Sequence, residues 1–298
     1  MAPINQTMQI DSPYLVPFDG SFDIADASMN PPEGAPDRKS CRKALKKSIG
    51  DLRELQEALY AEDRRSLLLV FQAMDAAGKD GTIRATTSGV NPAGFQVFSF
   101  KAPSKEELDH DFMWRLNRAL PERGRIGIFN RSHYEEVLVL RVHPEYLGSQ
   151  RIDVPNDLSD LWTDRFASIC DWEKHLARNG TDIVKFFLHV SPDEQARRFL
   201  RRLDTPAKNY KFSANDVAQR DHWESYMNAY EETLNATSRE HAPWYAIPAD
   251  DKPFMRMTVA DIIIRTLKAM NLKYPELPQN ERDKMATVRE KLQDELGE

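Results

Sequence analysis

Short apolar runs alternate with longer segments of helical periodicity along most of this chain. The five apolar runs, rich in strand-forming residues, are 66–72 (SLLLVFQ), 96–100, 125–130, 182–190 and 244–249. Apolar residues recur at helical spacing in the segments 40–62, 104–119, 156–178, 191–203, 213–235, 252–272 and 281–297. Strands that are apolar on both faces and alternate with helices predict a parallel sheet covered on two sides. Right-handed crossovers would bring the carboxyl ends of the strands, and a ligand, to one edge of that sheet.

The first 38 residues differ in composition from the rest of the chain. They contain six of its 18 prolines, which disfavours regular helices and strands. We interpret residues 1–38 as an extended arm that lies on the surface. Residues 39–298 then form a single α/β domain, because no internal repeat or low-complexity segment divides them.

Composition and charge narrow the class of protein. No apolar run approaches the roughly 18 residues of a membrane span, and the amino terminus lacks the basic and apolar regions of a secretory signal. The two cysteines, Cys41 and Cys170, do not have the spacing of a zinc cluster or a disulfide framework, which fits a reducing cytoplasm. A net charge of −6 argues against a general nucleic-acid binder, so any site for a polyanion must be local. We expect a cytoplasmic protein that binds neither membranes nor nucleic acids.

A phosphate-binding loop is the first chemical signal. The stretch FQAMDAAGKDG, residues 71–81, follows an apolar strand and leads into a helix, as a P-loop does. Small residues let backbone N–H groups close on phosphate oxygens, the helix amino terminus adds partial positive charge, and Lys79 would reach the phosphates. Ala73 stands where the usual pattern G-x-x-x-x-G-K-[ST] has its first glycine, and Asp80 stands where it has a hydroxyl. A strand–helix turn with chance glycines is the alternative interpretation.

The carboxylate of Asp75 lies inside this loop and would repel phosphates unless a cation lay between them. We therefore predict that Asp75 binds Mg²⁺, directly or through water. Asp80 is expected to cap the helix or to orient Lys79. Thr82 is a candidate for supporting the metal ligands from behind, and Arg84 either reaches phosphate or is an exposed charge. The residues expected to contact phosphate along the loop and the first turns of the helix are Ala76, Ala77, Gly78, Asp80, Gly81, Thr82 and Arg84.

Polar residues also follow the third apolar run, in GIFNRSHYEEV at 127–137. In P-loop enzymes a second strand ends in a carboxylate near magnesium, but here that position is the neutral Asn130. Arg131 suits the charge that develops on a transferred phosphoryl group. Glu135 is a candidate ligand for a second magnesium ion. His133 invites a phosphohistidine interpretation, although a single histidine is more often a hydrogen-bonded packing residue.

The densest basic segment of this acidic chain lies at 194–213. Its six cations are Arg197, Arg198, Arg201, Arg202, Lys208 and Lys211. Positions 198, 201 and 202 share one helical face. Such a helix after a strand is typical of the lid of nucleotide kinases, which closes on phosphates and excludes water, and a solvated charged face is the alternative. We place the lid at about residues 194–230, where Tyr226 and Tyr230 would pack the core or stack on a base.

Several segments together resemble one family of enzymes. AMDAAGKDGTIR, SGVNPAGFQVFSFKAPS, GIFNRSHYEEVLVLRVH, KFFLHVSPDEQARRFLRRLD and TSREHAPWYAIPAD are similar to motifs of the polyphosphate kinase 2 family, over roughly residues 40–275. The resemblance implies a P-loop NTPase-like, three-layer αβα fold similar to thymidylate kinase, with a five-stranded parallel sheet and a helical lid. It also implies a reversible, magnesium-dependent transfer of the terminal phosphoryl group of inorganic polyphosphate to a nucleotide.

The resemblance further implies roles for particular residues. It assigns phosphate binding to Lys79, a magnesium-linked role to Asp75 and a catalytic cation to Arg131. Where this chain has Asn130-Arg131-Ser132-His133-Tyr134-Glu135, much of the family has Asp-Arg-Ser-Trp-Tyr-Asn. The form found here resembles the class III branch, which is associated with phosphorylating both AMP and ADP and so with making ATP. We link Glu135 to the use of AMP, and the family implies a homodimer or a homotetramer.

The resulting hypothesis is a cytoplasmic polyphosphate:nucleotide phosphotransferase that acts on AMP and ADP by direct in-line transfer. Its catalytic candidates are Asp75, Lys79, Asn130, Arg131, Glu135 and Arg198. Further contacts with polyphosphate or the transferred group are expected from Arg201, Arg202, Lys208 and Lys211. The alternatives are an ATP-dependent kinase of a nucleotide or small metabolite on the same fold, and a nucleotide sensor with a degenerate P-loop.

Overall fold

A computed structural model of the protein describes residues 9–297. Five parallel strands form one sheet in the order β2-β3-β1-β4-β5. They are β1 (Ser66–Gln72), β2 (Phe95–Ser99), β3 (Ile126–Asn130), β4 (Thr181–His189) and β5 (Trp244–Pro248). Each predicted apolar run forms one strand, so the predicted five-stranded parallel sheet is confirmed. From β1 the chain adds strands first on one side and then on the other, which puts the loop after β1 where ligands bind in such sheets.

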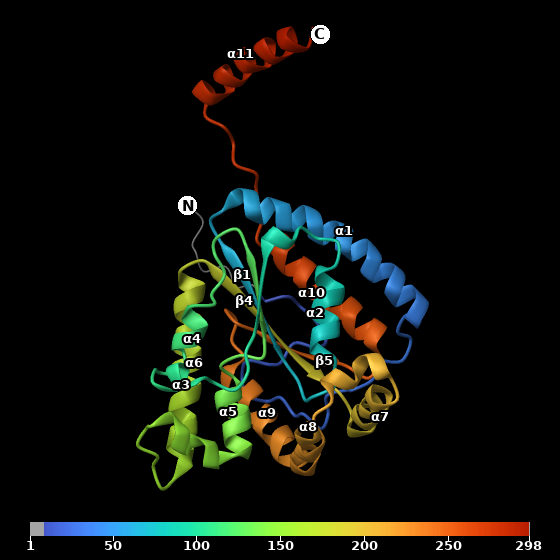
Figure 1. Ribbon diagram of the computed structural model, residues 1–298, viewed down its shortest axis with the longest axis vertical. Helices are drawn as coiled ribbons and strands as arrows, with labels where there is room; N and C mark the ends of the chain where they lie inside the picture. The colour runs from blue at the N-terminus through green and yellow to red at the C-terminus, as the bar shows by residue number, and fades with distance from the viewer. Residues whose placement is uncertain (1–8, 298) are drawn as a thin grey trace.

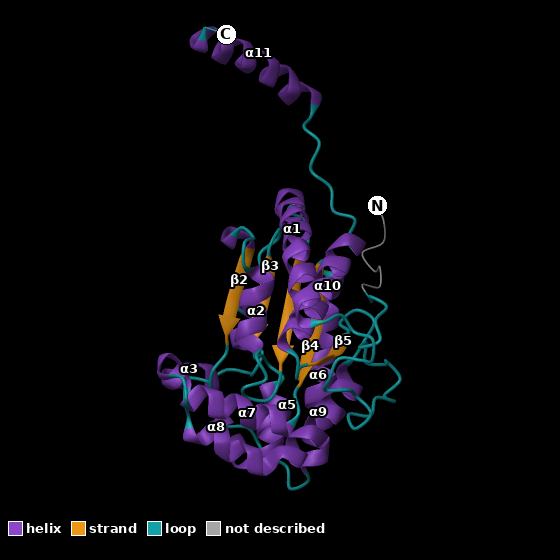
Figure 2. Ribbon diagram, turned by 90° about the vertical axis from the view of Figure 1, so that its right-hand side faces the viewer, coloured by secondary structure: helices purple, strands orange, loops and turns teal. Residues whose placement is uncertain are grey.

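Helices cover both faces of the sheet, so the three-layer αβα arrangement is also confirmed (Figure 1). One layer consists of α1 (Arg38–Glu62), α2 (Lys79–Thr87) and α10 (Lys252–Ala269). The other consists of α5 (Glu135–Val142), α6 (Leu158–Arg178) and α9 (Trp223–Thr237). The helices α7 (Pro192–Leu203) and α8 (Ala214–Ala218) lie beyond the carboxyl ends of the strands (Figure 2).

Burial of apolar side chains explains why these layers hold together. All seven residues of β1 are buried, as its position in the middle of the sheet requires. The helix α10 buries Val259, Ile262, Ile263 and Leu267. Each such side chain contributes about 1.5–3 kcal/mol when it leaves water. The strand β2 is at the edge and is only partly covered.

The prediction of one helix over 104–119 is wrong. Two short helices, α3 (Lys105–Leu108) and α4 (Trp114–Asn117), occupy this segment instead. The side chain of Asp111 accepts the N–H of Met113 at 2.9 Å, which offers the backbone a turn in place of a helix. The segment 213–235 is divided in a similar way, into α8, a 3₁₀ turn and α9, and the sequence patterns did not predict α5.

The first part of the segment 9–37, residues 10–16, runs along the outer edge of β5. Val16 N–H donates to the carbonyl of Trp244 at 2.9 Å, and Ala246 N–H donates to the carbonyl of Tyr14 at 2.8 Å. Leu15 thereby forms an antiparallel bridge with Tyr245. Val16 is fully buried. This segment therefore covers the backbone groups that an edge strand would otherwise present to another chain. Residues 1–8 of the predicted arm lie outside the described residues.

The carboxyl-terminal helix α11 (Gln279–Leu296) stands apart from the body of the protein (Figures 1 and 2). It buries none of its residues. Between positions 9 and 297, the helices are all too short or too polar to cross a membrane.

Candidate active site

The phosphate loop connects the centre of the sheet to α2. β1 ends at Gln72, and the loop bends back so that α2 begins at Lys79. Two loop residues have left-handed backbone angles, Ala76 with φ 62° and Gly78 with φ 111°. The first amides of a helix have no acceptor within that helix. The amino end of α2 therefore offers N–H groups and partial positive charge to an anion in the loop.

Lys79 is buried at the start of α2. Its Nζ donates a hydrogen bond to the carbonyl oxygen of Ala73, at the beginning of the loop. Burial lowers the pKa of Lys79, Arg131 lowers it further, and Asp75 and Glu135 oppose both effects. Burial has taken water away from the ammonium group, and a phosphate in the loop would supply compensating negative charge.

Arg131 lies between two carboxylates at the end of β3. Its Nη2 donates to Asp75 Oδ1 at 2.7 Å, and its Nη1 is 3.9 Å from Glu135 Oε2. The backbone of Arg131 has φ 63°, an uncommon conformation for a residue with a Cβ atom. Glu135 raises the pKa of Arg131, burial opposes this, and Asp75 adds to the increase. The guanidinium of Arg131 therefore stays charged between the phosphate loop, which carries Asp75, and the start of α5, which carries Glu135.

Asn130 connects β3 to the first turn of α2. Its Nδ2 donates to Asp80 Oδ1 at 2.9 Å and to Ser99 Oγ at 3.3 Å. An aspartate at position 130 would place a second carboxylate against Asp80, whereas an amide can donate to it. The two departures from the usual P-loop pattern are therefore complementary. Asn130 replaces an aspartate at the strand end, and its amide donates to Asp80, which replaces the usual hydroxyl.

Arg198 of α7 is directed at the back of the phosphate loop. Only 5% of it is exposed. Its guanidinium donates to the carbonyl oxygens of Ala76, Ala77, Ala249 and Asp250. Arg198 therefore holds the loop against the end of β5 and adds positive charge beneath it. Arg201, one helical turn away, is more exposed and pairs with Glu194 at 2.6 Å.

A large groove runs along the carboxyl edge of the sheet, with a volume of about 810 Å³. It is lined by the phosphate loop, the end of β3, the lid helix and the start of α10. Most of the predicted phosphate ligands line it: Ala76, Gly78, Lys79, Asp80, Gly81, Arg84, Arg198, Arg201, Arg202 and Lys208. Asp75, Asn130 and Arg131 line it as well. This concentration of cations in a chain of net charge −6 gives the groove the electrostatic character that a polyanion requires.

Two of these candidates, Thr82 and Ala77, are buried outside the groove. Thr82 is completely buried and places its hydroxyl 3.9 Å from Met255 Sδ, so it faces α10. Ala77 is completely buried too. The side chain of Lys211 lies outside the described residues. The sequence patterns missed three cations that do line the groove, Lys101, Lys252 and Arg256. Lys252 and Arg256 are one helical turn apart at the start of α10, and this spacing of two cations is the sequence pattern that could have identified them.

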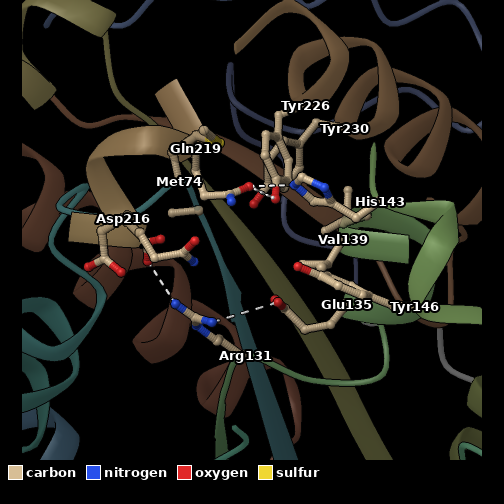
Figure 3. Close-up of a pocket in the computed structure, with 14 residues that line it drawn as sticks. Met74, Arg131, Glu135, Val139, His143, Tyr146, Asp216, Gln219, Tyr226 and Tyr230 are labelled. Carbon is tan, nitrogen blue, oxygen red and sulfur yellow. Dashed lines mark hydrogen bonds and ion pairs between the residues drawn. The ribbon is translucent and has the colours of Figure 1, made fainter. Parts of the chain in front are cut away.

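A second, smaller cavity of about 160 Å³ adjoins the groove (Figure 3). Its far wall is aromatic and apolar, with Tyr226 and Tyr230 of α9 and Val139 of α5. His143 and Gln219 are joined there by a hydrogen bond of 2.7 Å, and Tyr226 donates to the same Gln219 oxygen at 2.8 Å. Glu135 lines this cavity rather than the groove.

The two cavities meet at the charged cluster. Asp75, Arg131, Met74 and Asp216 line both of them. In Figure 3, which shows the smaller cavity, the guanidinium of Arg131 points toward Glu135. A group bound in the groove and a group bound in the smaller cavity would therefore face each other across Arg131.

Metal-binding potential in this region rests on carboxylates. Within residues 9–297, no group of three or more His, Cys, Asp and Glu side chains is placed to hold a metal ion by itself. Asp75 and Glu135 are the carboxylates on either side of Arg131. One or two carboxylates are what proteins usually offer to Mg²⁺, which takes its remaining ligands from water and substrate phosphates. The donor set therefore fits a hard cation that arrives with phosphates.

His133 belongs to the interior rather than to either cavity. It is fully buried beside Tyr134 and Trp172, and burial lowers its pKa. Behind it, Lys185 Nζ donates to Glu173 Oε2 at 2.6 Å and to Tyr134 Oη at 2.8 Å. This buried network holds the turn that leads from Arg131 into α5. The placement favours the packing interpretation of His133 over a phosphohistidine.

Comparison with known proteins agrees with this geometry. The family model described as polyphosphate kinase 2 matches residues 35–275. An "ADP-polyphosphate phosphotransferase" of Rhodopseudomonas palustris is 53% identical over 251 residues, which cover 83% of this chain and 86% of that protein. An "AMP/ADP-polyphosphate phosphotransferase" of Meiothermus ruber is 45% identical over 225 residues, 76% of this chain and 80% of that protein.

A solved structure gives the same result at the level of the fold. The crystal structure of polyphosphate kinase 2 from Arthrobacter aurescens TC1 superimposes with a TM-score of 0.83 at 36% identity, over 91% of this chain and 93% of that one. The matching region contains the phosphate loop, the end of β3 and the lid helix. This chain is therefore a member of the polyphosphate kinase 2 family.

Proposed function

We propose that this protein transfers the terminal phosphoryl group of inorganic polyphosphate to AMP and to ADP, producing ADP and ATP. The observation that carries the proposal is that a large basic groove and a small aromatic cavity share Asp75 and Arg131. The donor would lie in the groove and the acceptor in the cavity. The family membership and the names of the two relatives support the same chemistry.

The groove suits a donor that consists only of phosphates. Polyphosphate has no base or sugar, so recognition must come from charge and from backbone N–H groups. The cations of the groove come from five separate elements or loops: α2, the segment after β2, the end of β3, the lid and α10. Such a distributed set neutralises a chain along its length, while Lys79 and the amino end of α2 hold its reacting end.

The smaller cavity suits the nucleoside of the acceptor. Tyr226 and Tyr230 offer aromatic surface, and the hydrogen-bonded pair of His143 and Gln219 offers polar atoms at its wall. The names of the two relatives differ in the acceptor, so the acceptor has to be inferred from the residues. Glu135 begins α5 at the border of this cavity, next to Arg131. AMP has one phosphate fewer than ADP, and a cation held by Glu135 would compensate for the missing anchor.

Mg²⁺ is the cation that we propose for this site. Asp75 and Glu135 would hold it together with the substrate phosphates, and it would neutralise charge on the donor and acceptor. In the described structure both carboxylates lie against Arg131. Arg131 and the metal would therefore share the work of keeping two groups of phosphates close together.

Direct in-line transfer needs no covalent intermediate on the protein. A phosphate oxygen of AMP or ADP attacks the terminal phosphorus, a new P–O bond forms, and the bond from that phosphorus to the bridging oxygen breaks. Arg131 would stabilise the charge on the equatorial oxygens, and Lys79 would stabilise the leaving chain. The lid helix α7 would exclude water, which prevents hydrolysis of the donor.

A coupled assay of nucleotide products tests the proposal. Purified protein, Mg²⁺ and long-chain polyphosphate are given AMP alone and then ADP alone. ATP that forms from AMP through ADP supports use of both acceptors, and product from ADP only removes AMP from the proposal. If neither acceptor reacts, but ATP supports phosphorylation of a nucleotide or metabolite, the protein is an ATP-dependent kinase instead.

A further inference from the structure

Arg256 is a cation with more positive than negative neighbours. It lies on the second turn of α10, and its guanidinium packs over Gly81 in the first turn of α2. Its buried Nε atom has no hydrogen-bond partner among the described residues. Burial lowers the pKa of Arg256, and Arg84, Arg198 and Arg42 lower it further. A buried donor without a partner among cations is an arrangement that an anion would complete.

Arg42, one of the cations near Arg256, belongs to a helix outside the groove, α1. Arg84 and Arg256 line the groove, whereas Arg42 belongs to α1, which packs against both α10 and α2 (Figure 1). The first turns of α1 are unusually basic. Between Asp37 and Asp51 the chain has six cations and no acid: Arg38, Lys39, Arg42, Lys43, Lys46 and Lys47.

Helical geometry determines which of these cations face the groove. Positions 42, 46, 49 and 53 form one stripe along α1. Two members of that stripe contact the turn that follows α2, since Ile49 lies against Gly89 and Arg53 donates to the carbonyl of Gly89 at 3.3 Å. Arg42 and Lys46 therefore lie on the side of α1 that faces α2, and both are exposed.

The other basic positions of α1 are oriented differently. Arg38 is paired with Asp251 at 3.4 Å. Lys43 and Lys47 are on the far side of the helix from the buried residues Cys41 and Leu52, and are exposed to solvent.

We propose that Arg256, Arg84, Arg42 and Lys46 form a second polyphosphate-binding track that leads from the groove along the junction of α1 and α2. The inference rests on the proposed function, since the reacting end of the chain lies at Lys79. The track holds phosphates far from the reacting one. It therefore strengthens binding of long chains and leaves short chains, which end inside the groove, unaffected.

The test compares two double variants of equal charge. One is Arg42→Ala with Lys46→Ala, and the matched control is Lys43→Ala with Lys47→Ala, which lie about 100° further round α1 on its solvent side. Binding of tripolyphosphate and of a chain of about a hundred phosphates is measured by calorimetry, and KM and kcat are measured for both donors. The track variant should weaken long-chain binding and raise its KM on the order of 3–10-fold, with kcat unchanged. Binding of tripolyphosphate and all values for the control should stay within about twofold of the parent.

Salt dependence provides a second readout. If two phosphate contacts are lost, the slope of log affinity against log salt for the long chain should become shallower by about 1.4, as for single-stranded nucleic acids. Equal losses on short and long donors, or equal losses in both double variants, would overturn the track. A parent protein that binds polyphosphate in the groove without transferring phosphoryl groups would instead contradict the proposed function.

Discussion

The buried ion pair of Lys185 and Glu173 offers a quantitative prediction. Both side chains are fully buried, and Lys185 Nζ makes three hydrogen bonds, to Glu173, to Tyr134 and to the carbonyl of Thr237. In Lys185→Met the carboxylate of Glu173 would remain buried without its counter-charge. Removing one partner of such a pair costs about 3–5 kcal/mol of the free energy of unfolding. For a chain of 298 residues the melting temperature should fall by about 5–8 °C.

Two further variants separate the charge from the lost volume. Adding Glu173→Gln to Lys185→Met removes the isolated charge and keeps an acceptor for Tyr134, so at least half of the lost stability should return. Lys174→Met, at the exposed position next to Glu173, should change the free energy of unfolding by no more than about 0.5 kcal/mol.

Urea denaturation followed by circular dichroism measures all of these variants. The reasoning would be refuted by a cost below about 1 kcal/mol for Lys185→Met. A double variant as unstable as the single one would also refute it. Because Tyr134 precedes Glu135, we also expect Lys185→Met to lower kcat at temperatures where it is still folded.

Four other predictions concern the site and its surroundings. Lys79→Ala should fold normally and lose at least about 10²-fold in kcat/KM for polyphosphate, and unchanged turnover would sink the phosphate-loop assignment. Glu135→Asn should reduce phosphorylation of AMP more than that of ADP in parallel assays, and equal losses would remove its role in acceptor choice. Gly81→Ala places a Cβ atom 2.9 Å from Arg256 Nη2, so it should raise the KM for polyphosphate while thermal stability is kept or gains up to about 1 kcal/mol from helix propensity. Burial raises the pKa of Asp182 to about 6, above its unfolded value, so its ionisation destabilises the fold; the stability gained by Asp182→Asn over the parent should grow between about pH 4 and pH 6 and then level off.

The strands were predictable because a strand that is buried on both faces has a short, continuous apolar sequence. Each run such as SLLLVFQ at 66–72 is short, apolar and bounded by polar residues. Their order in the sheet has no comparable local signal, since β1 pairs with β3 and β4, which are distant along the chain. The prediction of one helix over 104–119 was wrong for a different reason. Its apolar spacing is helical, but the side chain of Asp111 bonds to the backbone and interrupts the helix.

For the site, too, residues in local sequence motifs were predictable, whereas residues from distant parts of the chain were not. Lys79, Asp75 and Arg131 follow strand ends in recognisable motifs, so their proximity was predictable. Lys101, Lys252 and Arg256 come from elements that only the tertiary structure brings to the groove. The surroundings of Arg198 were equally hidden, because a dense basic segment does not reveal that one of its arginines turns inward to backbone carbonyls.

The antiparallel bridge between Leu15 and Tyr245 has a consequence for biosynthesis. The two residues are 245 − 15 = 230 positions apart, so Leu15 leaves the ribosome long before Tyr245 has been synthesised. At about 5–20 residues per second, the early partner waits roughly 12–46 seconds before its strand exists. Contacts of such high sequence separation form late in folding. We therefore expect the amino-terminal segment to dock on β5 after the strands of the sheet have paired.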